Sequence, residues 1–232
     1  MVNTSLLSRN ALLSALQDAD HEMLTDISLI DLRQKESVQE AYDPIKVVHF
    51  PLDAVISIVT ILSSGTTIEV GTVGSEGTTG VPAALGASTM PNTAFCQVAG
   101  SSFVMSRNAL ERLLAGVPQF RQVVNAYAVG YLNVLAQMVA CNGVHPLDAR
   151  CARWLLMTHD RVGRPTFPLT QEFLSQMLGV RRSGVTMAAS AFADAGFIRY
   201  SRGLMEILDR DGLESEACEC YAFAKRELQF PK

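Results

Sequence analysis

One segment constrains the fold of this chain more than any other, because it holds two helical patterns joined by a single glycine. Residues 169–209 read LTQEFLSQMLGVRRSGVTMAASAFADAGFIRYSRGLMEILD. Thr170 is a residue type that caps helix N-termini, and we expect the helix after it to continue to Leu178. Gly179 supplies the positive φ that a tight turn between two helices needs. The segment therefore predicts a helix-turn-helix.

The second helical pattern is amphipathic, and it is followed by a pattern typical of a β-hairpin. Residues 197–200 and 204–208 read as two strands around a turn at 201–203. The two helices and the hairpin together predict a winged helix-turn-helix. The apolar stripe of the second helix consists of Val180, Val185, Ala188, Ala189 and Phe192.

The outward face of the second helix carries side chains that can read base edges in duplex DNA. Arginine bonds guanine in a bidentate manner, serine and threonine bond several bases, and a methyl-bearing side chain can contact the thymine methyl group. We expect Arg202, at the tip of the wing, to contact a phosphate. The predicted DNA-contacting residues are Thr170, Gln171, Arg181, Arg182, Ser183, Thr186, Met187, Ser190 and Arg202.

The charge distribution favours the same ligand locally. The whole chain has a net charge of -4, which alone argues against a polyanionic partner. Residues 161–202, however, hold six arginines against two carboxylates, a net charge of +4, whereas residues 1–147 hold seven basic and twelve acidic residues, a net charge of -5. A basic tip on an acidic body favours one orientation on DNA.

The remainder of the chain lacks the signals of a membrane or secreted protein. No run of about 18 uninterrupted apolar residues is present, and the N-terminus has no signal-peptide pattern. The five cysteines form no CxxC pair, so we expect free thiols. The sequence predicts a cytoplasmic protein with no membrane partner.

Residues 38–105 have the pattern of a β-domain. Residues 54–62 and 66–73 predict a hairpin around Ser63-Ser64-Gly65, and 95–98 and 102–105 read as two further strands about Gly100. Between these pairs, residues 74–80 are too rich in glycine for a regular strand, and they suit a loop that approaches a ligand or another backbone closely. Many short strands indicate a closed or sandwiched β-structure.

From Pro118 to about Asn142 the pattern becomes helical, with two apolar faces. A helix of this kind needs two partners, and we expect these to be the chain's own β-domain and the same helix of a second subunit. An ordinary core helix in a monomer is the alternative. The larger face, assigned to the dimer helix, is a seam of Phe120, Val124, Tyr127, Tyr131, Val134, Met138 and Cys141.

The order of these parts resembles the Crp/Fnr family of bacterial transcription regulators. The resemblance covers roughly residues 20–212 and is most specific over 169–198; GSEGTTGV at 74–81 and HPLDARCARWLL from 145 also match family patterns. It implies an α+β fold with four parts. These are a cyclic-nucleotide-binding-like sensory β-roll (1–117), a dimerisation helix (118–143), the winged helix-turn-helix DNA-binding domain (144–212) and a C-terminal tail (213–232).

The resemblance assigns roles on the recognition helix. Arg182 matches the family's commonest base-reading arginine, and Val185 matches a buried position. Ser183 and Met187 replace the glutamate and arginine of catabolite-activator members, so we expect a different operator sequence. The resemblance also implies a homodimer on an inverted repeat, with RNA polymerase as a candidate protein partner.

The resemblance is weaker at the effector site. Family members that bind cyclic AMP hold its phosphate with an Arg-Ser pair, and this chain has Asn92 and Thr93 at the matching positions. We therefore expect a small-molecule effector of unknown identity, not cyclic AMP, and we expect Glu76 to hydrogen-bond only its own loop. The candidate pocket residues are Gly74, Glu76, Gly77, Thr78, Thr79, Asn92 and Thr93.

No cofactor or metal is predicted. An iron-sulfur cluster of the family's N-terminal kind needs clustered cysteines, and the first cysteine here is Cys96. His49 is the single histidine of the β-region and is expected to be a packed strand residue instead of a haem ligand. Cys141 and His145 have the spacing of two ligands on one helix face, but Gly143 and Pro146 predict a helix end between and after them. Cys218 and Cys220 fall in a polar tail without a clear signal.

The sequence therefore predicts a transcription regulator and not an enzyme. A metal-dependent cupin-like enzyme would need two or three histidines with a carboxylate in the β-region, which offers only His49. A third alternative is a winged domain that docks a protein and binds no DNA.

Overall fold

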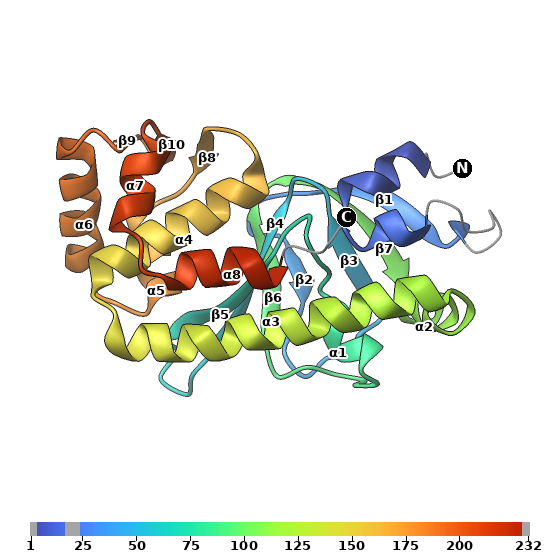
Figure 1. Cartoon of the computed structure of the whole chain (residues 1–232). Coiled ribbons are helices and arrows are strands. Elements are labelled where there is room, and N and C mark those ends of the chain that lie inside the picture. The colour runs from blue at the N-terminus through green and yellow to red at the C-terminus, as the bar shows by residue number, and fades with distance from the viewer. Residues whose placement is uncertain (1–3, 17–23, 229–232) are drawn as a thin grey trace. The chain divides into compact units, whose positions relative to one another are not determined.

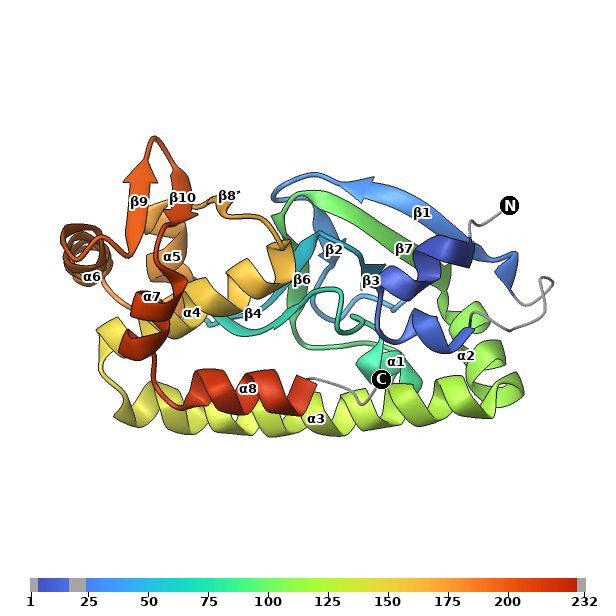
Figure 2. The ribbon, with the colours of Figure 1, turned by 45° about the horizontal axis from the view of Figure 1, so that its top comes forward.

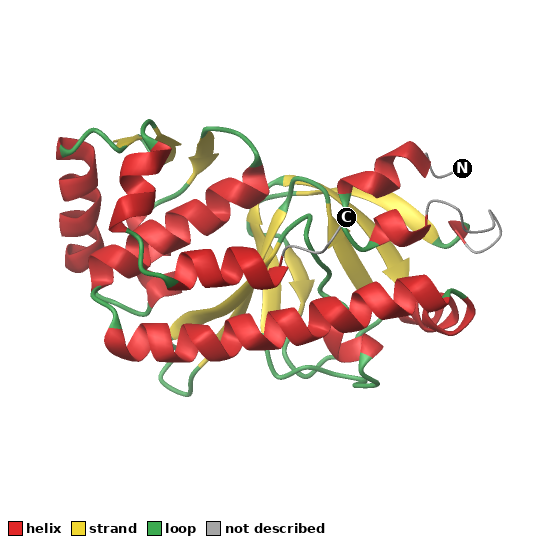
Figure 3. Ribbon diagram, in the orientation of Figure 1, coloured by secondary structure: helices red, strands yellow, loops and turns green. Residues whose placement is uncertain are grey.

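The computed structural model describes residues 4–16 and 24–228, whose helices and strands are drawn in Figures 1 and 3. The chain divides into two compact units. The first unit comprises the described residues up to 58, residues 72–132 and residue 228. The second comprises residues 59–71 and 133–227. The two units are described separately below.

Two antiparallel sheets form the β-roll of the first unit. One has the strand order β1-β7-β3 and the other β2-β6-β4-β5. The predicted hairpin is β4–β5, and its outer part, residues 59–71, belongs to the second unit. The strands are β1 (Ile27–Leu32), β2 (Ser37–Gln39), β3 (Val47–Pro51), β4 (Val55–Ile61), β5 (Thr67–Val73), β6 (Thr93–Val98) and β7 (Gly100–Ser106).

Gly100 forms the corner at which the chain passes from one sheet to the other. The sequence predicted a turn here, but β6 and β7 do not pair with each other, since β7 lies between β1 and β3. A Cβ atom on residue 100 would lie 2.5 Å from the backbone nitrogen of Ala54. Glycine is therefore required by close backbone approach.

Four short helical segments accompany the strands in the first unit. These are the 3-10 helices η1 (Thr4–Arg9) and η2 (Leu13–Leu16) and the helices α1 (Val81–Ala84) and α2 (Arg107–Gly116). Between η1 and η2, the fully buried Asn10 donates from Nδ2 to the carbonyl oxygens of Pro51 and Gly77, at 3.0 and 2.9 Å. Its Oδ1 accepts from the amides of Leu12 and Leu13. One buried amide thus satisfies four groups and holds the N-terminal segment on the roll.

Helix α3 (Pro118–Val144) has the predicted extent, but the structure corrects which of its faces is available to a partner. The seam assigned to the dimer is covered by the chain's own residues: Phe120, Val124, Tyr127, Tyr131, Val134 and Cys141 are buried, and Met138 is partly buried. Periodicity identified an apolar face without indicating what covers it. By length and composition alone α3 could also cross a membrane. Its larger apolar face, however, is buried by other residues of the same chain.

The second unit contains the predicted winged helix-turn-helix (Figure 1). Its wing has a third strand that the sequence pattern did not indicate, because β8 is only three residues long; the sheet order is β8-β10-β9. The elements are α4 (Leu147–Val162), β8 (Thr166–Pro168), α5 (Gln171–Leu178), α6 (Arg182–Asp194), β9 (Ile198–Ser201) and β10 (Leu204–Ile207).

The segment after the wing is not a simple polar tail. It forms α7 (Arg210–Glu216) and α8 (Cys220–Leu228). Figures 1 and 2 show α8 lying beside the second half of α3, where Asn133 Nδ2 donates to Glu227 Oε2 at 2.9 Å. Cys218 and Cys220 are buried as a result of this packing.

His49 lies on β3 and is buried, as expected for a packed strand residue. Thr78 Oγ1 donates to the His49 carbonyl at 2.8 Å, and the His49 amide donates to Thr79 Oγ1 at 3.0 Å. Burial lowers the pKa of the imidazole from 6.5 to about 4, because the cation would lose its hydration, while the negative charge of Glu36 opposes this shift.

The free energy of unfolding should therefore depend on pH through His49. Between pH 6.5 and about 4 the unfolded chain binds a proton at this residue and the folded chain does not, so stability falls as the pH falls. The full contribution is about 3 kcal/mol. Urea unfolding from pH 7 to pH 4 should show a shallower loss for His49→Phe than for the unchanged protein. Parallel curves would contradict the assignment.

Candidate nucleic-acid interface

The helix-turn-helix is built as the local sequence predicts. Thr170 is the N-cap of α5, and its Oγ1 accepts a hydrogen bond from the amide of Phe173 at 3.1 Å. Gly179 ends the helix in the left-handed conformation with a φ of 65°. Val185, Ala188, Ala189 and Phe192 of α6 are buried against the rest of the second unit. The predicted inner face of α6 is confirmed except at Val180, which lies in the turn before the helix and is only partly buried.

The opposite face of α6 is open to solvent. Thr186 Oγ1 donates a hydrogen bond to Oε1 of Gln171 at 2.8 Å. This bond links the recognition helix α6 to α5. Met187 is 69% exposed, so its methyl group is available to a partner. The exposed residues of this face are Arg181, Arg182, Ser183, Thr186, Met187 and Ser190.

The first turn of α6 has no side-chain cap. Arg181 occupies the N-cap position, and arginine has no acceptor atom, so no side chain accepts from the first amides of the helix. Uncapped amides and the positive end of the helix dipole favour an anion at this position. Arg181 and Arg182 therefore add two charges where the backbone already favours negative groups.

The wing presents Arg202 at its tip. Ser201 pairs with Leu204, and the two residues between them have positive φ, 51° for Arg202 and 78° for Gly203. This is the two-residue hairpin geometry that matches the twist of the flanking strands. A non-glycine residue in this conformation is uncommon.

The basic surface is smaller than the arginine count of the sequence implied. Arg161 is buried and donates to the Met157 carbonyl at 2.9 Å, and Arg199 forms an ion pair with Glu206 at 2.9 Å. Within residues 24–228, the exposed arginines of this region that form no ion pair are Arg164, Arg181, Arg182 and Arg202.

Comparison with protein families identifies this domain, since residues 149–216 match the family described as the Crp-like helix-turn-helix domain. This part of the chain is a Crp-like helix-turn-helix domain. Comparison with curated protein sequences gives no match.

Solved structures share the fold over most of the chain. FixK2 from Bradyrhizobium japonicum is 16% identical with a TM-score of 0.71, covering 83% of this chain and 98% of that one. A transcriptional regulator of the Crp/Fnr family from Eubacterium rectale is 15% identical, with a TM-score of 0.68 and coverages of 90% and 98%. A Crp/Fnr regulator from Thermus thermophilus is 20% identical, with a TM-score of 0.60 and coverages of 82% and 98%. The chain thus shares the fold of Crp/Fnr regulators and carries a Crp-like helix-turn-helix domain, and it is a DNA-binding transcription regulator.

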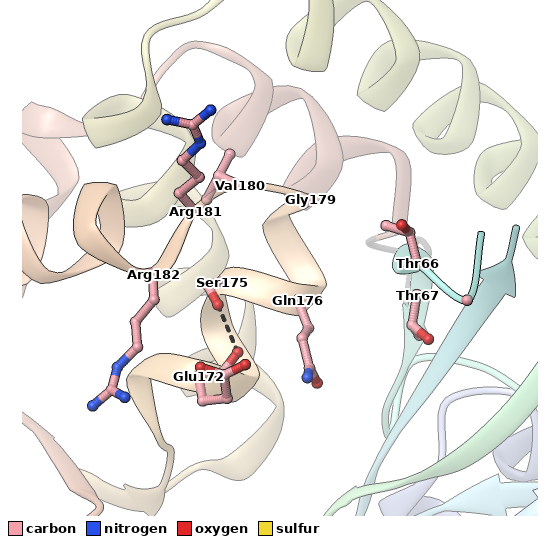
Figure 4. Close-up of a pocket in the computed structure, with 10 residues that line it drawn as sticks. Thr66, Thr67, Glu172, Ser175, Gln176, Gly179, Val180, Arg181 and Arg182 are labelled. Carbon is pink, nitrogen blue, oxygen red and sulfur yellow. Dashed lines mark hydrogen bonds between the residues drawn. The ribbon is translucent and has the colours of Figure 1, made fainter.

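The Crp-like domain packs with the tip of the β4–β5 hairpin inside the second unit. Trp154 Nε1 of α4 donates to Glu69 Oε1 at 2.7 Å. An open hollow is lined by hairpin residues 65–67 and by residues of α5, the turn and the start of α6 (Figure 4). In this view Arg181 and Arg182 point in different directions, so the two adjacent arginines serve different parts of the surface.

In the β-roll, much of the candidate effector loop is engaged in its own structure. Glu76 Oε1 accepts from the Gly74 amide at 3.2 Å, in agreement with the expected contact within the loop. The hydroxyls of Thr78 and Thr79 are buried and bonded to the main chain of His49. Asn92 and Thr93 are partly exposed near the start of β6. Thr78 Oγ1 donates to the His49 carbonyl and accepts from the Gly80 amide, so a ligand that used its proton would have to replace a bond.

Gly77 of this loop lies against the buried ring of Tyr127, and a Cβ atom there would overlap the ring. Gly77→Ala should lower the free energy of unfolding by about 1–3 kcal/mol, because a close-packed interior does not accept an extra methyl group without displacement. Gly143→Ala is the matched control, since no atom lies within 4 Å of its Cβ position and the residue is in a helix. It should be neutral or stabilising by up to about 1 kcal/mol. Equal urea midpoints at one protein concentration would contradict this.

Proposed function

We propose that the protein is a cytoplasmic homodimer that binds an inverted-repeat operator and responds to a small-molecule effector. The observation that carries the proposal is the exposed face of α6, which begins with two exposed arginines and an uncapped helix terminus in a Crp-like domain. A domain used only to dock a protein has no need of this combination of a helix-end anion site and arginines without ion pairs.

The arginines divide into two roles. Arg182 is in the first turn of α6, where recognition helices contact base edges, and we assign it to guanine. Arg202 is on the wing tip, remote in sequence from the helix, and we assign it to a phosphate of the DNA backbone. Thr170 and Gln171 stand at the start of α5, where backbone contacts of such domains are common.

The exposed side of α3 supports the dimer. Val129, Leu132 and Val139 are 60%, 54% and 75% exposed, and Ala136 is exposed between them. Their spacing of three, four and three residues makes a straight apolar stripe, the pattern of a coiled-coil seam. Solvent exposure of such a stripe is unfavourable in a monomer, and the same helix of a second copy would cover it.

The effector is proposed to be something other than cyclic AMP. Asn92 and Thr93 carry no charge, and a buried cyclic phosphate would lack a cationic partner at these positions. RNA polymerase is proposed as the protein partner of the DNA-bound dimer, by analogy with regulators of this type.

Arg182→Ala and Arg202→Ala should affect DNA binding differently. After selection of the operator from random duplexes, Arg182→Ala should cost about 1–3 kcal/mol and relax the base preference at one position of each half-site. Arg202→Ala should weaken binding to all sequences similarly and reduce the slope of log K against log salt by about one. Fluorescence anisotropy over a salt series separates the two effects.

Arg33→Ala, an exposed arginine outside the Crp-like domain, is the control and should leave both affinity and salt slope unchanged. Selection that returned no inverted repeat would argue against the proposed function. Identical behaviour of the Arg182 and Arg202 variants would refute the division of roles.

Val139→Asp should weaken the dimer at least about tenfold, because it places a charge in the apolar stripe of α3. Val47→Asp is the control, since Val47 is also an exposed valine, 43% accessible, but lies on β3. Sedimentation velocity over a concentration series measures both dissociation constants. An unchanged dimer in Val139→Asp would show that the stripe is not the interface.

A further inference from the structure

Four metal-ligating side chains that lie far apart in the sequence meet at the end of α3. Cys141 and His145 come from the last turn of α3 and the residue after it, and Cys218 and Cys220 flank the start of α8. Their ligand atoms all lie within 4.8 Å of one another. Cys141 Sγ is 3.5 Å from Cys218 Sγ and 3.4 Å from His145 Nδ1, which in turn is 3.6 Å from Cys220 Sγ.

These separations fit a single tetrahedral ion. Zinc binds thiolate sulfur at about 2.3 Å and imidazole nitrogen at about 2.0–2.1 Å, so the corners of such a tetrahedron are about 3.5–3.8 Å apart. Three sulfurs and one imidazole nitrogen are also a ligand set of structural zinc sites. We propose that Cys141, His145, Cys218 and Cys220 bind one Zn²⁺ ion.

The histidine is already oriented for coordination through Nδ1. Its other ring nitrogen, Nε2, lies 3.2 Å from Oε1 of Glu219, the residue between the two cysteines of the CEC sequence. A carboxylate at Nε2 fixes the proton there and leaves the Nδ1 lone pair directed at the three sulfurs. Gln137 Nε2 donates to Cys220 Sγ at 3.2 Å, as amides do around zinc-bound thiolates.

The surrounding charges suit an anionic zinc centre. Three thiolates and one Zn²⁺ ion carry a net charge of -1, and Arg150 and Arg153 both interact electrostatically with Cys141. Their Nε atoms are buried and have no hydrogen-bond partner among the described residues. Arg150 is partly buried and Arg153 is buried, and their other nitrogens donate to the Leu178 carbonyl and to Met157 Sδ. Beside an anionic metal thiolate centre both cations would also compensate charge.

Two other uses of the cysteines fit the geometry less well. The sulfurs of Cys141 and Cys218, 3.5 Å apart, are well beyond the disulfide length of about 2.05 Å. An iron-sulfur cluster binds its ligands through different iron atoms and therefore needs ligand atoms spread more widely than in a mononuclear site. The compact tetrahedron favours one ion.

The site would fasten the C-terminal helices to the junction between α3 and α4. Residues 141 and 145 lie just before α4, and residues 218 and 220 follow α7. One ion would thus fix the start and the end of the chain segment that contains the whole Crp-like domain. Its role in this arrangement is structural, because all four positions are taken by protein ligands.

Metal content tests the proposal directly. The full-length protein, purified without chelator or affinity-tag metal, should contain one zinc ion per chain by mass spectrometry of the elements. After exchange, Co²⁺ should give the absorption bands of a tetrahedral ion with thiolate ligands. Cys220→Ser should lose the stoichiometric zinc, whereas Cys96→Ser, which changes a buried cysteine of β6, should retain it.

Glu219→Gln tests the site even if Cys220→Ser does not fold, because Glu219 is an exposed residue and is not one of the four ligands. It should fold and lower the affinity for Zn²⁺ by about 10–100-fold in competition with a chromophoric chelator. Protein that neither contains zinc nor gives the cobalt spectrum would overturn the site. So would a disulfide between Cys141 and Cys218 in freshly purified protein, or unchanged zinc affinity in Glu219→Gln.

Discussion

The burial of one apolar face of α3 by the chain itself determines how the rest of the helix can be used. Phe120, Val124 and Tyr127 are fully buried, and Phe120 lies 6.4 Å from Phe50 of β3, ring centre to ring centre. With this side occupied, Val129, Leu132 and Val139 must face outward. The last member of the buried face is Cys141, and its thiol lies in one buried cluster with Cys218 and Cys220.

The local features of the Crp-like domain could be predicted from sequence almost to the residue. Thr170 and Gly179 act through their own backbone conformation and nearest neighbours, so the ends of α5 follow from residue type. The β4–β5 hairpin was predictable for the same reason, since the turn residues and β-branched runs are adjacent in the chain. Strands β1, β2 and β8 were missed, and β3 was expected only as the strand position of His49, because each depends on pairing with a distant partner.

The errors in the candidate sites have one physical origin, which is that spacing within a helix does not reveal what lies across from it. The seam of α3 was assigned to the wrong partner, and Arg161 was counted as surface charge although it is a buried residue of α4. Cys141 and His145 have the spacing of a ligand pair, but the expected helix end at Gly143 and Pro146 argued against a metal site, and none was predicted. A four-ligand site also needs Cys218 and Cys220, which come more than 70 residues later. The helix α8 that begins there was not predicted.

The contact between Cys141 and Cys218 has a topological consequence. The chain leaves α3 near Cys141 and comes back beside this residue at Cys218, after the whole Crp-like domain. The two ends of the segment from α4 to α7 therefore lie next to each other. Domains whose ends are adjacent can be inserted into a host chain without separating the parts on either side. Here the host is the helical pair α3 and α8, and the module also contacts that pair beyond the cysteines, since Tyr221 of α8 donates to Asp160 of α4 at 2.8 Å.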